Sequence, residues 1–222
     1  ANVYFAEQQW GKVIDHAESI DGGLTSVAQP PKQEFKTLLT NGKFQGNNAW
    51  HGEMQAQIGF AFTPLLHQEK RDKALVIGYG TGVTSRVFHD AGFQHVDIAE
   101  LSADVINLAN KHFSEVNNRV TELDRVKLHL TDGRNFLLLS PAATRYDVVS
   151  IEITSIWFAG ASSLYNREFY QLIKSRLAND GVLQQWVQLH HLSPTDILTV
   201  ISTLREEFAY VTLYEVGGQG IL

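Results

Sequence analysis

The 222-residue chain contains no cysteine, so disulfide bonds, thiolate nucleophiles and zinc–thiolate sites are excluded. No run of apolar residues approaches the roughly 20 that a membrane-spanning helix requires. Positive charge is also scarce, because 18 basic and 24 acidic residues give a formal net charge of -6. We therefore expect no nucleic-acid partner, whereas a small cationic substrate is compatible with the acidic balance.

Several catalytic motifs are missing as well. The nine histidines show neither His-x-x-x-His nor His-Glu-x-x-His spacing, so we expect no metal site. The chain has no Gly-x-Ser-x-Gly elbow and no phosphate loop of the Gly-Lys-Ser/Thr type. These absences argue against hydrolase and kinase functions.

Two segments of different character follow one another along the chain. Residues 1–50 contain short apolar runs separated by turn signals such as Asn41-Gly42, a pattern typical of β-hairpins. Residues 51–222 open with a helical pattern at 54–67 and then alternate strands and helices. The pattern predicts strands near 74–78, 95–100, 126–131, 146–152, 181–189 and 209–216, and helices near 82–91, 102–115, 166–178 and 193–207. We therefore predict an α/β fold in which a Rossmann-like, doubly wound, mostly parallel sheet (51–222) follows a small β domain (1–50).

The most informative segment is ALVIGYGTGVT at 74–84, an apolar run that leads into three alternate glycines and then a helical pattern. Gly78, Gly80 and Gly82 allow the backbone to approach a ligand without a Cβ in the way. Glu100 ends the next predicted strand, where a carboxylate can accept both hydroxyls of a ribose. Its alternative role is to cap the following helix. Together these features predict an adenosine-containing ligand.

Acids also end the next two predicted strands. Asp132 and Gly133 follow the third strand, where an aspartate can accept from the adenine amino group or simply cap a short helix. Glu152 ends the fourth strand, and the loop after it is aromatic and contains glycine. A carboxylate partly desolvated by that loop would attract the cationic end of a bound cofactor. The alternative is a buried acid held by backbone donors.

These segments resemble the spermidine synthase family, the polyamine aminopropyltransferases built on the class I S-adenosylmethionine-dependent methyltransferase fold. The resemblance covers nearly the whole chain and rests on LLTNGKFQ at 38–45, the glycine turn at 74–83, and segments 97–102, 131–134 and 163–170. Segments 157–160 and 185–189 are most similar to spermidine-synthase-like domains fused to membrane-transporter-like segments. The resemblance implies a homodimer, a cytoplasmic location, and a membrane segment outside this chain if it belongs to the fused type.

The resemblance also implies roles for individual residues. The donor, decarboxylated S-adenosylmethionine or S-adenosylmethionine, would be bound without a metal by Gly78, Gly80, Thr81, Gly82, Glu100, Asp132, Gly133, Gln45 and Gln57. Within this set the glycines shape the pocket for the methionine-derived part, and Gln45 and Gln57 lie near the aminopropyl end. Glu152 would position the attacking nitrogen of a small amine and accept its proton. Ser155 and Trp157 would belong to the substrate loop.

The chain departs from the family pattern at its acids. The family has an aspartate where this chain has neutral Thr81, and it has Asp-Ser-Ser-Asp-Pro where this chain has EITSI at 152–156. With a single carboxylate the site would hold a doubly charged diamine less well, which argues against putrescine as the acceptor. Neutral Thr81 removes a repulsion toward a donor that retains its carboxylate. Methyl transfer and nucleoside binding without catalysis therefore stay open as alternatives to aminopropyl transfer.

The chain starts at Ala1, its only methionine is Met54, and a strand pattern is still running at Leu222. We therefore expect further residues at both ends.

Overall fold

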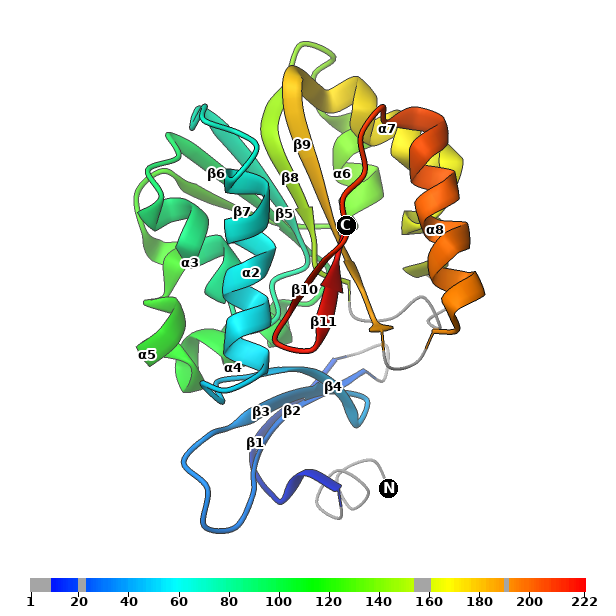
Figure 1. Cartoon of the computed structure of the whole chain (residues 1–222). Coiled ribbons are helices and arrows are strands. Elements are labelled where there is room, and N and C mark those ends of the chain that lie inside the picture. The colour runs from blue at the N-terminus through cyan, green and yellow to red at the C-terminus, as the bar shows by residue number, and fades with distance from the viewer. Residues whose placement is uncertain (1–8, 20–22, 154–160, 190–191) are drawn as a thin grey trace.

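The computed structural model describes residues 9–19, 23–153, 161–189 and 192–222. Its N-terminal part is a four-stranded antiparallel sheet (Figure 1). Its strands follow chain order: β1 (Lys12–Glu18), β2 (Leu24–Gln29), β3 (Thr37–Thr40) and β4 (Lys43–Asn47). Asn41 and Gly42 connect β3 to β4 with φ of 51° and 76°, which the twist of a two-residue hairpin requires. Because the Asn41 side chain accepts from the Leu24 amide at 2.9 Å, the same turn also anchors β2.

The second sheet has seven strands in the order β10-β11-β9-β8-β5-β6-β7. Five of them run parallel: β5 (Lys73–Ile77), β6 (His95–Glu100), β7 (Val126–Leu130), β8 (Tyr146–Ile151) and β9 (Leu177–Val187). The hairpin of β10 (Tyr214–Val216) and β11 (Gln219–Ile221) completes the sheet, with β11 antiparallel to β9. The strand order reverses between β5 and its neighbours β6 and β8, and such a switch point opens a crevice at the carboxyl ends of the strands.

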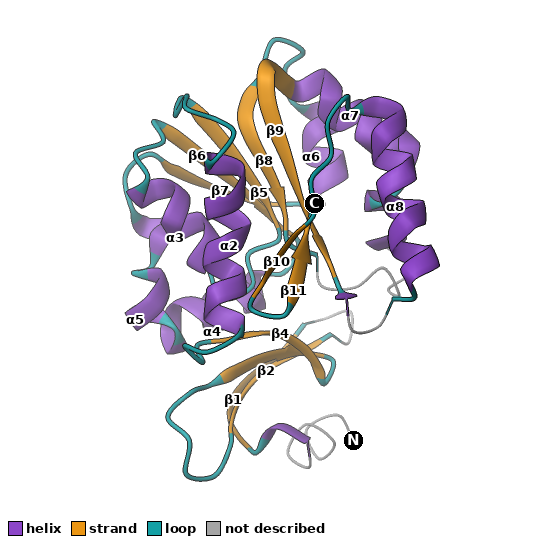
Figure 2. Cartoon of the chain, viewed as in Figure 1, coloured by secondary structure: helices purple, strands orange, loops and turns teal. Residues whose placement is uncertain are grey.

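Helices cover both faces of the large sheet (Figure 2). One face carries α2 (Glu53–Leu65), α3 (Val83–Asp90), α4 (Ala103–His112) and α5 (Ser114–Asn117), and the other carries α6 (Gly133–Leu139), α7 (Arg167–Arg176) and α8 (Pro194–Glu207). Short 3-10 turns occupy Val120–Glu122 and Ala161–Leu164. Side chains of β5 alternate between the two cores, because Val76 joins the first and Leu75 joins the second. Burial on both faces explains why this strand is an unbroken apolar run.

The small sheet lies across the edge at which the parallel strands end (Figure 1). Its last strand finishes at Asn47, and α2 begins at Glu53. No helix of the described ranges is long and apolar enough to cross a membrane.

The predicted α/β fold with a mostly parallel sheet is confirmed, and the differences concern individual elements of its second half. The strand predicted over 209–216 is present only in its last part, because the strand assigned there, Tyr214–Val216, pairs with β11 and begins later than predicted. The strand is short because its partner β11 has only three residues, so the residues before Tyr214 have no strand opposite them with which to form hydrogen bonds. The strand β9 starts at Leu177, earlier than predicted, and α6 lies where no helix had been assigned.

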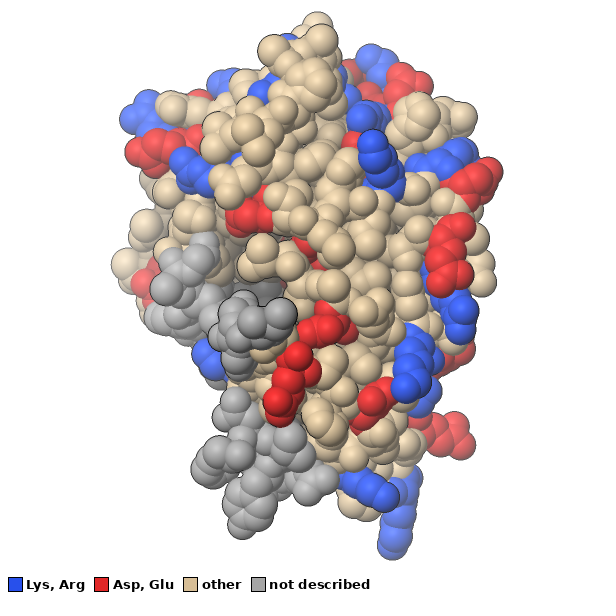
Figure 3. Space-filling model, turned by 180° about the vertical axis from the view of Figure 1, so that it is seen from behind, with Lys and Arg blue, Asp and Glu red and all other residues tan. Residues whose placement is uncertain are grey.

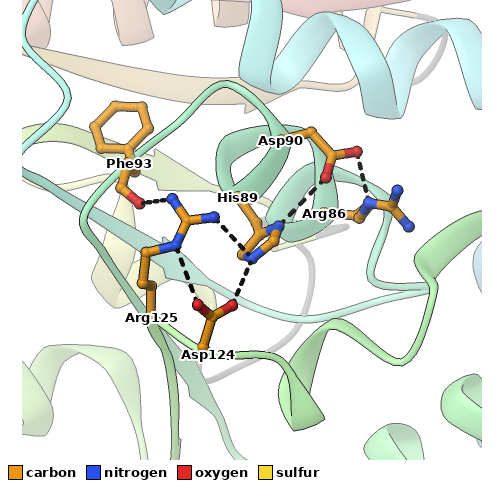
Figure 4. Close-up of polar contacts among 6 residues, drawn as sticks. All are labelled: Arg86, His89, Asp90, Phe93, Asp124 and Arg125. Atoms are coloured by element: carbon orange, nitrogen blue, oxygen red, sulfur yellow. Dashed lines mark hydrogen bonds and ion pairs between the residues drawn. The ribbon is translucent and has the colours of Figure 1, made fainter.

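A polar network on the surface of α3 joins this helix to the turn before β7 (Figure 4). The Arg86 Nε lies 2.5 Å from an Asp90 oxygen, and His89 contacts Asp90 and Asp124 at 3.3 and 3.5 Å. Arg125 lies 3.8 Å from Asp124 and 3.1 Å from the His89 ring. The two aspartates are at least half exposed, so each pair contributes at most about 1 kcal/mol and the network is structural.

Candidate active site at the carboxyl edge of the parallel sheet

The turn after β5 adopts a backbone that needs glycine. Gly78, Gly80 and Gly82 have φ of 92°, 52° and 86°, a region that side chains with a Cβ rarely enter. A Cβ on Gly82 would lie 2.6 Å from the Tyr79 ring, so packing also excludes one there. Gly80 faces the small sheet, since a Cβ at this position would meet the Gln45 carbonyl oxygen at 3.7 Å. The turn therefore presents bare backbone toward β4.

Glu100 is fixed at the end of β6 by two backbone amides. One carboxylate oxygen accepts from the Tyr79 amide and the other from the Ser102 amide, both at 2.8 Å. Burial raises the pKa of Glu100, and these amide donors oppose the rise. The cap of α4 is Ser102, whose hydroxyl accepts from the Val105 amide, so the alternative role of Glu100 as that cap is not adopted. Each oxygen of Glu100 retains a lone pair for a further donor.

Asp132 caps α6, as the alternative interpretation of this residue predicted. Its side chain accepts from the Asn135 amide at 2.9 Å and is half-buried. Gly133 begins the helix directly against β5, because a Cβ there would lie 2.4 Å from the Ile77 Cγ2. The close packing places Asp132 at the same strand edge as the glycine turn, with its second oxygen available to a ligand.

Glu152 follows β8 directly and lies beside the glycine turn. Its amide donates to the Ile77 carbonyl at 2.9 Å, and a Cβ on Gly78 would approach the Glu152 Cβ to 3.7 Å. Its Oε1 is buried and has no hydrogen-bond partner among the described residues. Burial raises the pKa of Glu152 well above its ordinary value, the nearby Thr84 side chain opposes the rise, and the charges of Glu53 and Glu100 add to it. Backbone donors do not hold Oε1, contrary to the alternative stated for this acid.

A hydrogen-bond network joins the small sheet, α2 and the glycine turn through the buried side chain of Gln57. The Thr81 hydroxyl donates to the Gln57 side-chain oxygen. The Gln57 amide nitrogen donates to the Asn47 carbonyl at 3.0 Å and to the Glu53 carboxylate at 3.3 Å. Gln45 comes from β4 on the same side of the turn. The structure thus brings the predicted residues from β4 and α2 to the turn.

Glu53, which was not among the residues predicted from the sequence, takes part in this network. Burial raises the pKa of its carboxyl to about 7, and the hydrogen bond from Gln57 opposes the rise. The one sequence signal was the spacing of Glu53 and Gln57, which places them one helical turn apart. Two predicted residues, Ser155 and Trp157, lie outside the described residues.

Other features of the described chain lie apart from this edge. A cavity of about 530 Å³ lies among α2, β9 and α8, lined by residues such as Pro64, Gly181 and Phe208, and none of the predicted site residues lines it. No group of three or more potential metal ligands occurs within the described ranges. On the face drawn in Figure 3, charged side chains of both signs are interspersed and form no continuous basic stripe.

A parallel sheet with a glycine turn after its first strand, and acids after the next three, places the chain among the Rossmann-like α/β proteins. Comparison with known families is more specific. The spermine/spermidine synthase domain matches residues 56–216, and the chain therefore belongs to this family.

Similar proteins include two curated aminopropyltransferases. Polyamine aminopropyltransferase 2 of Pseudomonas aeruginosa is 33% identical over 153 residues, which cover 68% of this chain and 43% of that protein. Polyamine aminopropyltransferase 2 of Hyperthermus butylicus is 29% identical over 186 residues, which cover 81% and 58%. The chain spans about half the length of these curated relatives.

Solved structures show the same fold. Spermidine synthase from Thermotoga maritima superposes with a TM-score of 0.79 at 18% identity, covering 96% of this chain and 72% of that chain. A spermidine synthase in complex with the transition state analogue AdoDATO gives a TM-score of 0.81 at 19% identity and the same coverage. Human methyltransferase-like protein 13 in complex with SAH gives 0.58 at 22% identity, covering 75% and 77%. The likeness to domains fused to membrane proteins stays a prediction.

Proposed function

We propose that this chain forms the reacting centre of an aminopropyltransferase that moves an aminopropyl group from decarboxylated S-adenosylmethionine to a small amine. One observation carries the proposal: Glu152 holds a buried carboxylate oxygen with no hydrogen-bond partner among the described residues, directly beside the glycine turn. A buried carboxyl without a cation is costly, and a cationic ligand at this point would compensate it. Membership of the spermine/spermidine synthase family supports the same chemistry.

The nucleoside would lie along the edge formed by the ends of β5, β6 and β7. Glu100 is preorganised for the ribose, because two amides orient its carboxylate and leave lone pairs for the sugar hydroxyls. Asp132 has one oxygen engaged in capping α6, and the other would accept from the adenine amino group. The bare backbone at Gly80 would let the methionine-derived part pass between the turn and β4.

The reaction is a displacement at the carbon that links the propyl chain to the sulfonium. The amine nitrogen forms the new C–N bond, the C–S bond breaks with its electron pair on sulfur, and the neutral thioether leaves. An alkylammonium titrates near about 10.4, so the amine must lose a proton before it attacks. Glu152 is suited to accept that proton, because burial raises the pKa of its carboxyl toward that of an effective base. Most of the remaining rate enhancement would come from positioning.

The test combines product analysis with binding. The chain is incubated with labelled decarboxylated S-adenosylmethionine and a panel of mono-, di- and triamines, and the thioether nucleoside is quantified. Formation of methylthioadenosine together with an aminopropylated amine is the expected result. Calorimetry with the same donor measures binding separately. A chain that binds the donor but forms no thioether with any amine contradicts the transferase proposal and leaves a nucleoside-binding domain.

One observation favours a second candidate, methyl transfer from intact S-adenosylmethionine. Thr81 is neutral and its hydroxyl is engaged with Gln57, so the turn itself places no carboxylate against a donor carboxylate. The two functions give different nucleoside products from their donors. Methyl transfer yields S-adenosylhomocysteine from the intact donor, and its appearance in place of methylthioadenosine would decide for this alternative.

A further inference from the structure

Glu53 lies at the junction of three elements next to the glycine turn. It opens α2, and its carboxylate accepts from the Gln57 amide nitrogen at 3.3 Å. A Cβ placed on Gly46 of β4 would lie 3.1 Å from a Thr81 methyl group and 3.8 Å from a Glu53 oxygen. The carboxylate of Glu53 therefore stands close to the side chain of Thr81, with β4 as a wall beside both.

A role for Glu53 in stabilising the helix dipole does not explain this position. An acid in the first turn of a helix gives that benefit while fully solvated. The carboxyl of Glu53 is instead desolvated enough to raise its pKa to about 7. None of the ion pairs within the described ranges includes Glu53, so the neighbouring amide of Gln57 is its one hydrogen-bond donor there.

A second buried acid faces the same space from the other side of the turn. Glu53 lies near Thr81 of the glycine turn and Glu152 lies beside Gly78 of the same turn, and the charge of Glu53 adds to the rise in the pKa of Glu152. Glu152 contributes an Oε1 that is buried and lacks a hydrogen-bond partner among the described residues. Two desolvated acids beside one turn give a site in which a bound cation would stabilise the ionised form of each carboxyl. Such a site favours a ligand with a positive charge near each acid.

We propose that Glu53 binds the ammonium at the propyl end of the donor and thereby selects a donor without a carboxylate at that end. The inference rests on the proposed function, which places the methionine-derived part of the donor at the glycine turn. Thr81 supplies no charge there, and the Gln57 side chain links its hydroxyl to Glu53. The negative charge that the turn lacks is thus provided from α2. An intact donor would bring its own carboxylate against Glu53 and be repelled.

The experiment measures three nucleosides against matched variants of the full chain. Calorimetry is carried out with decarboxylated S-adenosylmethionine, S-adenosylmethionine and methylthioadenosine, which lacks the propylamine. The variants are Glu53→Gln, which keeps the shape and removes the charge, and Glu53→Asp, which keeps the charge. Glu168→Gln makes the same chemical change at an exposed position of α7 and serves as the control.

The expected result is a loss of affinity only for the nucleosides that carry the propylamine. Glu53→Gln should bind the decarboxylated donor about ten- to hundredfold more weakly, the loss expected for one charge-assisted hydrogen bond. In the same variant, affinity for methylthioadenosine should stay within about threefold of the wild-type value, and the preference for the decarboxylated over the intact donor should shrink. Glu53→Asp should retain most of that preference. An unchanged preference in Glu53→Gln would overturn the assignment. Equal loss of methylthioadenosine binding would overturn it too, because it would show a structural role. A wild-type chain that binds none of the three nucleosides would instead contradict the proposed function itself.

Discussion

Replacing Glu152 by glutamine should separate binding, catalysis and stability in one variant. At an intermediate dielectric, a carboxylate 4 Å from an ammonium is stabilised by about 4 kcal/mol, and glutamine abolishes this attraction. It also removes the proton acceptor, a loss that typically costs about 100-fold or more in rate. We therefore expect turnover of Glu152→Gln to fall at least about 100-fold. Donor affinity should change little if Glu100 and Asp132 carry nucleoside binding.

The same variant should be more stable than the wild type at neutral and alkaline pH. Burial raises the pKa of Glu152 in the folded state. A carboxyl with a raised folded pKa contributes most to stability below its unfolded pKa, and this contribution is lost as pH rises through the folded value. Glutamine carries no charge and escapes that loss. Denaturant unfolding at about pH 8 should therefore show a gain that shrinks toward about pH 4.

A loss of activity together with a gain in stability distinguishes a functional acid, because replacing a purely structural acid would not lower activity while raising stability. Steady-state turnover, calorimetry of donor binding and denaturant midpoints at both pH values are the measurements, with Glu168→Gln on the exposed face of α7 as the matched control. Full turnover in Glu152→Gln would remove this residue from the mechanism. Lower stability at about pH 8 would refute the assignment of its carboxyl as buried and uncompensated.

Three further outcomes are expected. Glu100→Gln should weaken nucleoside binding about tenfold or more in calorimetry, because an amide group cannot accept from both backbone amides and still serve a ribose; unchanged affinity would place the sugar elsewhere. Gly133→Ala should lower the free energy of unfolding by about 1–3 kcal/mol in denaturant titrations, because the new methyl group overlaps Ile77; a neutral effect would show that α6 shifts freely. The preference for the decarboxylated over the intact donor should rise as pH increases through about 7, because Glu53, whose pKa burial raises to about 7, loses its proton there, and Glu152 and Glu100 are the other acids near the turn. Competition assays across pH would show a flat profile if Glu53 were remote from the donor.

The sequence was most informative where backbone requirements and burial coincide. The run before Gly78 is apolar on both faces because neighbouring strands and helices bury both, and this can be seen without coordinates. The acids at 100, 132 and 152 could be placed at one edge because parallel strands share the direction in which they end. Whether Asp132 caps a helix could not be decided from the pattern, and the structure shows that it does.

Side-chain networks between segments far apart in the sequence could not be predicted from local sequence patterns. Glu53 follows a glycine in the first turn of a helix, a position that normally indicates a solvated acid. Its burial depends on how β4 packs beside the glycine turn, and no local pattern encodes that packing. The limits of β10 likewise depend on the short partner β11, since a strand extends only as far as its ladder.

The amide of Gln57 has a consequence for how the two sheets can evolve. This side-chain amide group contacts a carbonyl of the small sheet, an acid of its own helix and a hydroxyl of the glycine turn. Exchanging the N-terminal sheet for an unrelated one would remove the carbonyl that accepts from this amide and would expose the neighbouring turn to water. The N-terminal sheet and the glycine turn are therefore coupled through one side chain, so a substitution that moves β4 should also disturb the turn.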